Sequence, residues 1–313
     1  MTIASGPGNA SQTHPATEQI WKGEVPPPGG IVVGVDGSAE SVAALKVAAG
    51  IAASRRCPLH VVSVLLPFKS YKIDPGLDEP QSQVDALRVQ LRETAIRDIM
   101  SSVQPDNNWS YEIQMGRPPR VLCTIAELRG ADVIVVGLRQ HGVMDRILGG
   151  ETPLQVMRIS KLPVLAVPSG LGEVKKAVVA IDFSSASINA AQTVLRMMGS
   201  SGTLYVVYVE APGDVMSDGM ILGGDGGRCM DVVSRFRRLT QEIGAGPGIR
   251  VETVILYGSP VPALVEFAER VGADVIAAGA HGHNQFERFL LGSVSTGLTR
   301  NAPCAVLVAA PDQ

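Results

Sequence analysis

The residues best suited to chemistry lie in the segment 273–296. There an apolar run ends at Gly279, Gly282 follows, and after nine further residues come Gly292 and Ser293, which resemble the start of a helix. Glycines let a backbone approach a ligand closely, and a helix N-terminus offers unpaired N–H groups and the positive end of its dipole to an anion. The spacing therefore predicts a strand, a phosphate-binding loop and a helix that begins at the phosphate.

An acidic residue ends the first apolar run in each half of the chain. Asp36 follows 31–35, and Asp182 follows 177–181. In open α/β sheets a ligand binds beyond the carboxyl ends of the strands, where the strand order reverses, so both aspartates are candidate ligand contacts. The alternative is that each one only caps the helix that follows it, as Asp commonly does.

The elements that must position these residues occur twice. Short apolar runs alternate with segments of helical periodicity. The Gly-x-Pro motif at 116–118 recurs at 258–260, and the Ala-Asp-Val-Ile motif at 131–134 recurs at 273–276, both at an offset of 142. Several landmarks in one register predict a tandem duplication.

The predicted fold class is α/β, with two tandem doubly wound domains built on mainly parallel sheets. Alternating strands and helices with short connections favour this class, and right-handed crossovers narrow the topology. We expect a disordered leader over 1–28, because it is rich in Gly, Pro, Ser and Thr. A first domain is expected over 29–169 and a second over 174–313.

Composition and charge exclude several classes of protein. The net charge is −3 and the pI is about 6.0, without the basic, aromatic-rich patch of a nucleic-acid partner. No apolar run reaches the roughly 18–20 residues of a membrane span, and residues 1–28 lack a signal-peptide pattern. We therefore expect a cytoplasmic protein without nucleic-acid or membrane partners. Scattered cysteines predict free thiols rather than disulfides or metal ligands; they are Cys57, Cys123, Cys229 and Cys304.

Other catalytic and nucleotide motifs are absent from the sequence. It contains no dinucleotide fingerprint after the first strand of either half, no Walker motif and no nucleophile elbow. His281 and His283 flank Gly282, but no third ligand stands at a metal-binding spacing. The sequence therefore predicts neither catalytic residues nor a metal site.

These residues together resemble the universal stress protein family in its tandem two-domain form. The resemblance implies five strands per domain in the order 3-2-1-4-5, the last strand being a dimer edge, and ATP in members with the motif G-x2-G-x9-G-(S/T). The second half carries the whole pattern. The resemblance assigns the adenosine end to Asp182 and Val209, the ribose to Gly279, and the phosphates to Gly282, Gly292, Ser293 and the Val294 amide.

The first half keeps the adenosine end of this pattern and departs from it at the phosphates. Gln140 stands in place of the second glycine, Glu151 replaces the serine, and Pro153 has no N–H to offer. A carboxylate within a few ångströms of a triphosphate repels it and weakens the binding free energy by ~1–4 kcal/mol. We expect little or no ATP binding here, with AMP or adenosine still possible. The matching residues, which are the candidate contacts of this half, are Asp36, Val64, Gly137 and Gly150.

The resemblance implies an ATP-binding, nucleotide-responsive regulator in stress response; whether Mg²⁺ accompanies the ATP is left open. Three alternatives also stay open: a slow ATPase or phosphotransferase, a structural dimer module without nucleotide, and an AMP or cyclic AMP binder. The apolar last strands, 163–167 and 304–308, are expected to pair with each other, either within the chain or between the chains of a homodimer.

Overall fold

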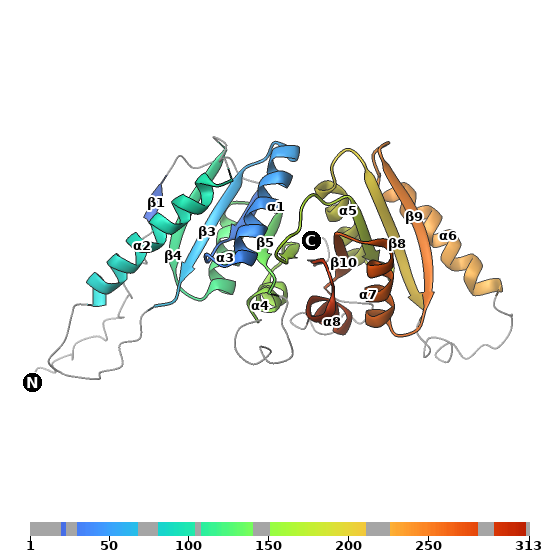
Figure 1. Cartoon of the computed structure of the whole chain (residues 1–313). Helices are drawn as coiled ribbons and strands as arrows, with labels where there is room; N and C mark the ends of the chain where they lie inside the picture. The colour runs from blue at the N-terminus through green and yellow to red at the C-terminus, as the bar shows by residue number, and fades with distance from the viewer. Residues whose placement is uncertain are drawn as a thin grey trace, which may run out of the picture.

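In the described part of the chain, eleven strands form one continuous sheet (Figure 1). The structure is a computed structural model that describes residues 20–22, 30–67, 81–103, 108–139, 151–210, 226–280 and 291–310. The strands are β1 (Ile20–Lys22), β2 (Ile31–Gly34), β3 (Leu59–Leu65), β4 (Trp109–Met115), β5 (Val133–Gly137), β6 (Val164–Val167), β7 (Lys176–Ala180), β8 (Gly202–Glu210), β9 (Ile249–Tyr257), β10 (Val275–Gly279) and β11 (Ala305–Ala309).

Each half of the chain forms the predicted doubly wound unit. Neighbouring strands follow the order β4-β3-β2-β5-β6 in the first half and β9-β8-β7-β10-β11 in the second, with parallel pairing inside each half. Numbered within each half, both orders read 3-2-1-4-5. The predicted fold class and strand order are therefore confirmed.

The two halves join through their last strands. β6 pairs with β11 in antiparallel orientation, with Leu165 opposite Leu307, and both side chains are fully buried. Of the two pairings that the sequence left open, the structure therefore contains the one within the chain.

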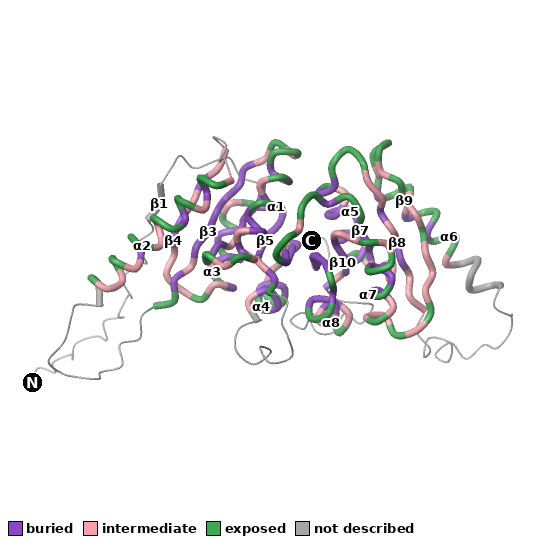
Figure 2. The backbone as a smooth tube through the Cα atoms, in the orientation of Figure 1, coloured by how far each residue is buried: buried purple, intermediate pink, exposed green. Residues whose placement is uncertain are grey.

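Helices cover both faces of the sheet. One face packs against α1 (Ala39–Arg55), α2 (Gln81–Ser101), α5 (Ser185–Met197) and α6 (Gly226–Glu242). The other packs against α3 (Pro118–Leu128), α4 (Glu151–Ile159), α7 (Pro260–Val271) and α8 (Ser293–Asn301). Because both faces are covered, the central strands are apolar on both sides, and buried backbone runs along them in Figure 2.

A short strand lies inside the predicted leader, which corrects our expectation of disorder for those residues. Ile20–Lys22 forms β1 and pairs antiparallel with β4, Ile20 lying opposite Ile113 and Lys22 opposite Tyr111. The outer edge of β4 offers unpaired backbone groups that another strand can bind. A segment of three residues is too short to show the alternation of side chains by which a strand is recognised in a sequence. The remaining residues of 1–28 lie outside the described part of the chain.

The three cysteines whose side chains the structure describes are free thiols, and they are buried or half-buried. Cys57 is half-buried, and Cys123 and Cys304 are buried. Burial raises the pKa of Cys123 to about 11 and that of Cys304 to about 12. Both therefore remain neutral thiols, as the sequence predicts for structural cysteines. Cys229 lies outside the residues whose side chains are described.

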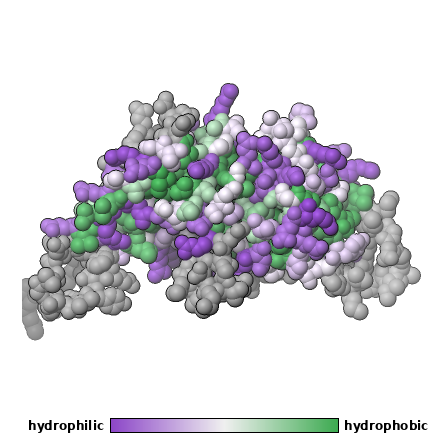
Figure 3. All heavy atoms as spheres, viewed as in Figure 1, coloured by the Kyte–Doolittle hydropathy of each residue, from purple (hydrophilic) through white to green (hydrophobic). Residues whose placement is uncertain are grey.

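No helix within the described ranges is both long enough and apolar enough to cross a membrane. In the space-filling view of Figure 3, polar and apolar residues are interspersed over the visible face.

Candidate functional site

Each half contains the same turn between its first strand and first helix. In the first half the Asp36 carboxylate Oδ1 accepts hydrogen bonds from Ser38 N at 2.9 Å and Ser38 Oγ at 2.6 Å. In the second half Asp182 Oδ1 accepts from Ser184 N and Oγ at the same two distances. The aspartates therefore hold the turn through one carboxylate oxygen. Among the described residues, no hydrogen bond engages Oδ2 of Asp182.

The helix caps in these turns are serines, not aspartates. Ser38 Oγ accepts a hydrogen bond from Ser41 N at 3.2 Å at the start of α1, and Ser184 Oγ accepts from Ser187 N at 3.3 Å at the start of α5. The simple capping alternative for the aspartates is therefore wrong. Asp182 orients the capping serine instead, which leaves its second oxygen available to a ligand.

The residue after each aspartate has a left-handed backbone. Gly37 has φ +90° and Phe183 has φ +63°. Glycine adopts this conformation freely, whereas a bulky residue adopts it only when its surroundings compensate. The Phe183 ring packs against Tyr208 and Phe236 at centroid distances of 5.8 and 5.6 Å, and the Arg235 guanidinium lies 4.3 Å from its centroid. These contacts hold the strained turn.

The charge on Asp36 is stabilised by its neighbours. Burial raises the pKa of Asp36, but the Ser38 hydrogen bonds, Ser41 and the Arg92 charge together outweigh burial and hold its pKa below the usual value. Arg92 also donates a hydrogen bond from its guanidinium to the Asp36 backbone oxygen. Asp36 is therefore ionised at neutral pH.

In each half a valine lies one residue before the end of the second strand, and its backbone groups point toward the side of the first strand. Ile181 N donates to Val207 O at 2.8 Å, and the register between β7 and β8 ends at Val207. Alternate residues of a strand direct their N–H and C=O groups to the same side. Val209 therefore directs these groups toward the β7 side, past the last pairing. Val64 does the same, since Val35 N donates to Val62 O at 2.8 Å.

The glycines that end the fourth strands have a packing role. A Cβ atom on Gly279 would lie 2.9 Å from both Ala186 Cβ and Ser187 N, and a Cβ atom on Gly137 would lie 2.7 Å from Ser41 N. Such contacts are too close for real atoms, so these positions let the first helix of each half approach the end of the fourth strand. The predicted ribose contact of Gly279 stays a prediction.

The start of α8 lies beside the same glycine. Gly292 N donates to Ala280 O at 2.7 Å, and the buried Ser295 Oγ donates to Gly279 O at 2.6 Å. Gly292 is the N-cap and supplies no side-chain hydrogen bond, so the first-turn amides, including that of Val294, have no side-chain cap from it. The ends of β10, α5 and α8 therefore meet at one point. Gly282 lies outside the described residues.

In the first half, the predicted residues line one cavity of about 180 Å³. Asp36, Val64 and Gly137 all line it, together with Thr152 of α4 and Arg139. Thr152 carries a hydroxyl group and directly follows Glu151, which stands where the second half has Ser293. Arg139 was not among the predicted site residues, and its place two residues beyond β5 is the one sequence feature that points to it. Gln140 and Gly150 lie outside the described residues, as does the Glu151 side chain.

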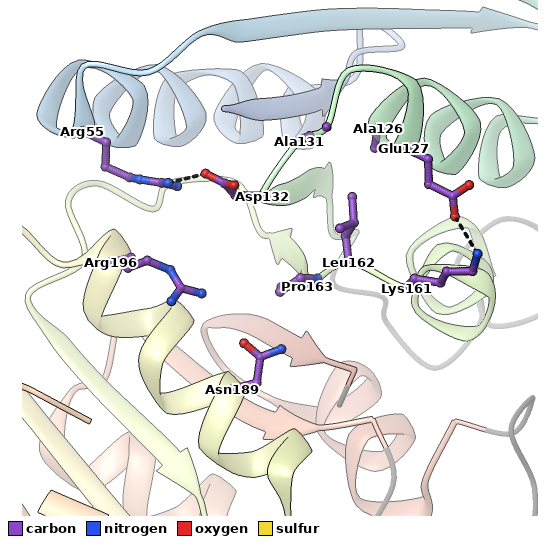
Figure 4. A pocket seen from close by; sticks show the side chains of 11 residues that line it. Arg55, Ala126, Glu127, Ala131, Asp132, Lys161, Leu162, Pro163, Asn189 and Arg196 are labelled. Carbon is purple, nitrogen blue, oxygen red and sulfur yellow. Dashed lines mark hydrogen bonds and ion pairs between the residues drawn. The ribbon is translucent and has the colours of Figure 1, made fainter. Parts of the chain in front are cut away.

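A second cavity, of about 720 Å³, lies between the two halves (Figure 4). It lies where β5 and β6 begin, not at the carboxyl ends where doubly wound sheets bind ligands. Its charged side chains form ion pairs: Arg55 with Asp132, and Lys161 with Glu127 at 3.7 Å. Arg196 instead donates to Thr193 Oγ1 at 2.9 Å. The cavity is therefore a charged cleft between the halves, separate from the predicted site.

Within the described ranges, no three His, Cys, Asp or Glu side chains are placed to hold a metal ion. His281 and His283 fall outside those ranges. The candidate site of the second half therefore consists of a carboxylate, backbone groups and the start of a helix.

Comparisons with known proteins agree with the duplicated fold. The family model described as the universal stress protein family matches residues 30–168 and 173–310. A universal stress protein of Mycolicibacterium smegmatis is 26% identical over 301 residues, which cover 90% of this chain and 97% of that protein. One of Methanocaldococcus jannaschii is 30% identical over 146 residues, covering 43% of this chain and 81% of that protein.

The fold is also similar to a solved structure. The crystal structure of a universal stress protein from Archaeoglobus fulgidus matches with a TM-score of 0.65 and 21% identity, covering 90% of this chain and 98% of that chain. At this identity the similarity concerns the fold alone.

Proposed function

This chain belongs to the universal stress protein family, and on that basis we propose that it binds ATP in its second half and acts in the cytoplasm as a nucleotide-responsive regulator of a stress response. The observation that carries the proposal is the meeting of α5 and α8 at Gly279, where Ala186, Ser187 and Ser295 all contact one strand end. Two helix N-termini there favour a polyanion.

The adenosine end of ATP would be held by Asp182 and Val209. The Oδ2 atom of Asp182 accepts a ribose hydroxyl, because its Oδ1 already binds Ser184. The N–H and C=O groups of Val209 continue past the last pairing with β7, and this donor and acceptor match the hydrogen-bonding edge of adenine.

The phosphates would be held at the start of α8. Gly292 and Ser293 are the N-cap and first residue of that helix, so amide groups and the exposed Ser293 hydroxyl are directed at the anion. Gly282 completes this loop in the proposal. Mg²⁺, where present, would neutralise phosphate charge. The described residues of this site supply no second carboxylate and no general base, so the proposal is one of binding rather than turnover.

For the first half we propose binding of adenosine or AMP but little ATP. Asp36, Val64 and Gly137 line the cavity, which supports the adenosine end. Pro153 lacks the N–H that Ser295 has at the equivalent position of α8, and Glu151 adds a negative charge at the first residue of α4. Arg139 supplies one positive charge at the cavity, which suits a single phosphate better than three.

Two measurements test this function in the full chain. Mass spectrometry of small molecules released from the purified protein should identify an adenine nucleotide. In ATP titrations, Asp182→Asn should weaken binding by about tenfold, or about 1.4 kcal/mol, whereas the matched control Asp36→Asn should leave ATP affinity unchanged. A protein that takes up no adenine nucleotide, or whose two variants behave alike, would contradict the proposal.

A further inference from the structure

The outer edge of β9 is the one long sheet edge that no described strand covers. The other edges are occupied: β6 and β11 pair with each other, and β1 pairs with β4. β9 lies at the opposite end of the sheet from β1 (Figure 1). A sheet edge displays unpaired N–H and C=O groups that another strand can bind.

The backbone of β9 presents the same groups that bind β1 in the first half. Gly116 N donates to Leu65 O at 2.9 Å, so Tyr111 and Ile113, at odd offsets from Gly116, direct their backbone groups outward, where they face Lys22 and Ile20.

The second half repeats this geometry at the offset of 142. Gly258 N donates to Glu210 O at 3.0 Å, and so Thr253 and Ile255 direct their N–H and C=O groups outward. They are the counterparts of Tyr111 and Ile113. In the described part of the chain, no strand takes the place that β1 takes on β4.

The side chains of β9 are also more apolar and more exposed than those of its counterpart. Glu112 of β4 is only 3% exposed, whereas its counterpart Val254 is partly exposed. Ile113 is likewise 3% exposed, whereas Ile255 is partly exposed, and Tyr257 is 74% exposed. Apolar side chains of β9 are therefore partly exposed at positions where the corresponding side chains of β4, including the carboxylate of Glu112, are buried. Val254 and Ile255 also contact the core on their own faces of the sheet, so Tyr257 is the exposed large apolar side chain that a second strand at this edge would cover.

We propose that β9 pairs with β9 of a second copy of this chain, antiparallel and across a two-fold axis at Thr253. Antiparallel pairing joins like strands of the two halves already, at β6 and β11. Both strands pair over their whole length, Ile249–Tyr257, only when Thr253 lies opposite Thr253. This register is the self-complementary one that a two-fold interface requires.

In this register the residues whose backbone groups point outward form favourable pairs, whereas Arg250 lies opposite Leu256 and Glu252 opposite Val254. Val251 lies opposite Ile255 and Ile249 opposite Tyr257, which are β-branched and aromatic combinations that stabilise sheets. Moving the axis by one residue, to Glu252, would place two carboxylates directly opposite each other, which destabilises a sheet. Because β1 covers the far edge, pairing through β9 closes at two copies.

The first test removes one edge N–H group. Thr253→Pro deletes an N–H that points away from β8, so the β8–β9 pairing is kept, and proline is tolerated at such edge positions. Sedimentation over a concentration series should give a dimer for the wild type and for the control Thr253→Ser, and a monomer for Thr253→Pro. Circular dichroism checks that each variant is folded. A wild type that stays monomeric, or a Thr253→Pro variant that stays dimeric, would overturn the proposal.

The second test reads the register directly. Directly opposite, hydrogen-bonded residues have Cα atoms about 5.5 Å apart, within the range of a disulfide. Under oxidising conditions Thr253→Cys should therefore run as a covalent dimer on a non-reducing gel. The control Glu252→Cys should run like the wild type, whose native cysteines set the background. Equal cross-linking of both variants would refute the axis at Thr253.

Discussion

Asp36 differs from a solvent-exposed carboxylate because the folded turn stabilises its negative charge. Burial opposes that charge, but Ser38, Ser41 and Arg92 outweigh burial and lower the pKa. A carboxyl group whose pKa is lower in the folded state stabilises the protein above its unfolded pKa, and this contribution is lost as the pH falls through the folded pKa.

A pH prediction follows for this residue. The wild type should be more stable than Asp36→Asn at neutral pH, because only the carboxylate gains the charge-assisted bonds. The difference should shrink as the pH falls below the ordinary Asp value of 3.8. Urea unfolding of both proteins at several pH values measures it. A difference that grows toward low pH would contradict this view of the turn.

The strained residue Phe183 gives a second prediction. Replacing Phe183 by alanine should cost about 2 kcal/mol, less than a fully buried Phe→Ala change, because the ring is only half-buried. Phe183→Gly should be more stable than Phe183→Ala by ~1 kcal/mol, since glycine relieves the cost of φ +63°. Elsewhere in a strand or helix the order is reversed. Urea unfolding ranks the variants, and an alanine variant that is the more stable one would refute strain at this turn.

Among the elements, the close approach of α5 to the end of β10 depends on one missing side chain. Gly279→Ala would place Cβ 2.9 Å from both Ala186 Cβ and Ser187 N, and relieving the overlap should cost ~1–3 kcal/mol. Gly172→Ala is the control, because nothing lies within 4 Å of its added Cβ. Thermal unfolding should therefore show a lower Tm for Gly279→Ala only. Equal Tm values would show that α5 can move away freely.

The elements differ in how well the sequence foretells them. The duplication follows from motifs such as 116–118 and 258–260, which repeat at one offset, whereas the strand order within each half came from the resemblance to the family. β1 could not be foreseen, because its pairing depends on the edge of β4 rather than on its own three residues. The packing role of Gly279 could not be foreseen either. In a sequence, a glycine that lets a helix pack closely cannot be distinguished from one that lets a ligand approach. Arg139 reaches the cavity from a position that no motif marks.

At the scale of the whole molecule, α4 and α8 touch across the junction between the two halves. Thr299 Oγ1 of α8 lies 3.4 Å from Met157 Sδ of α4, and α4 and α8 lie beside each other in Figure 1. The two halves therefore form one body through the β6–β11 pairing and this helix contact. In this body the proposed ATP site belongs to one half, because Glu151, Pro153 and Gln140 alter the other.

The most direct test of that asymmetry places the charge of the first half into the second. Calorimetric titration of the full chain with ATP should give one site per chain in the wild type. Ser293→Glu, which copies Glu151, should weaken that site at least about tenfold, whereas Glu151→Ser alone should create no second ATP site, because Pro153 still lacks its N–H. Two equal ATP sites in the wild type, or unchanged affinity in Ser293→Glu, would contradict an ATP site confined to the second half.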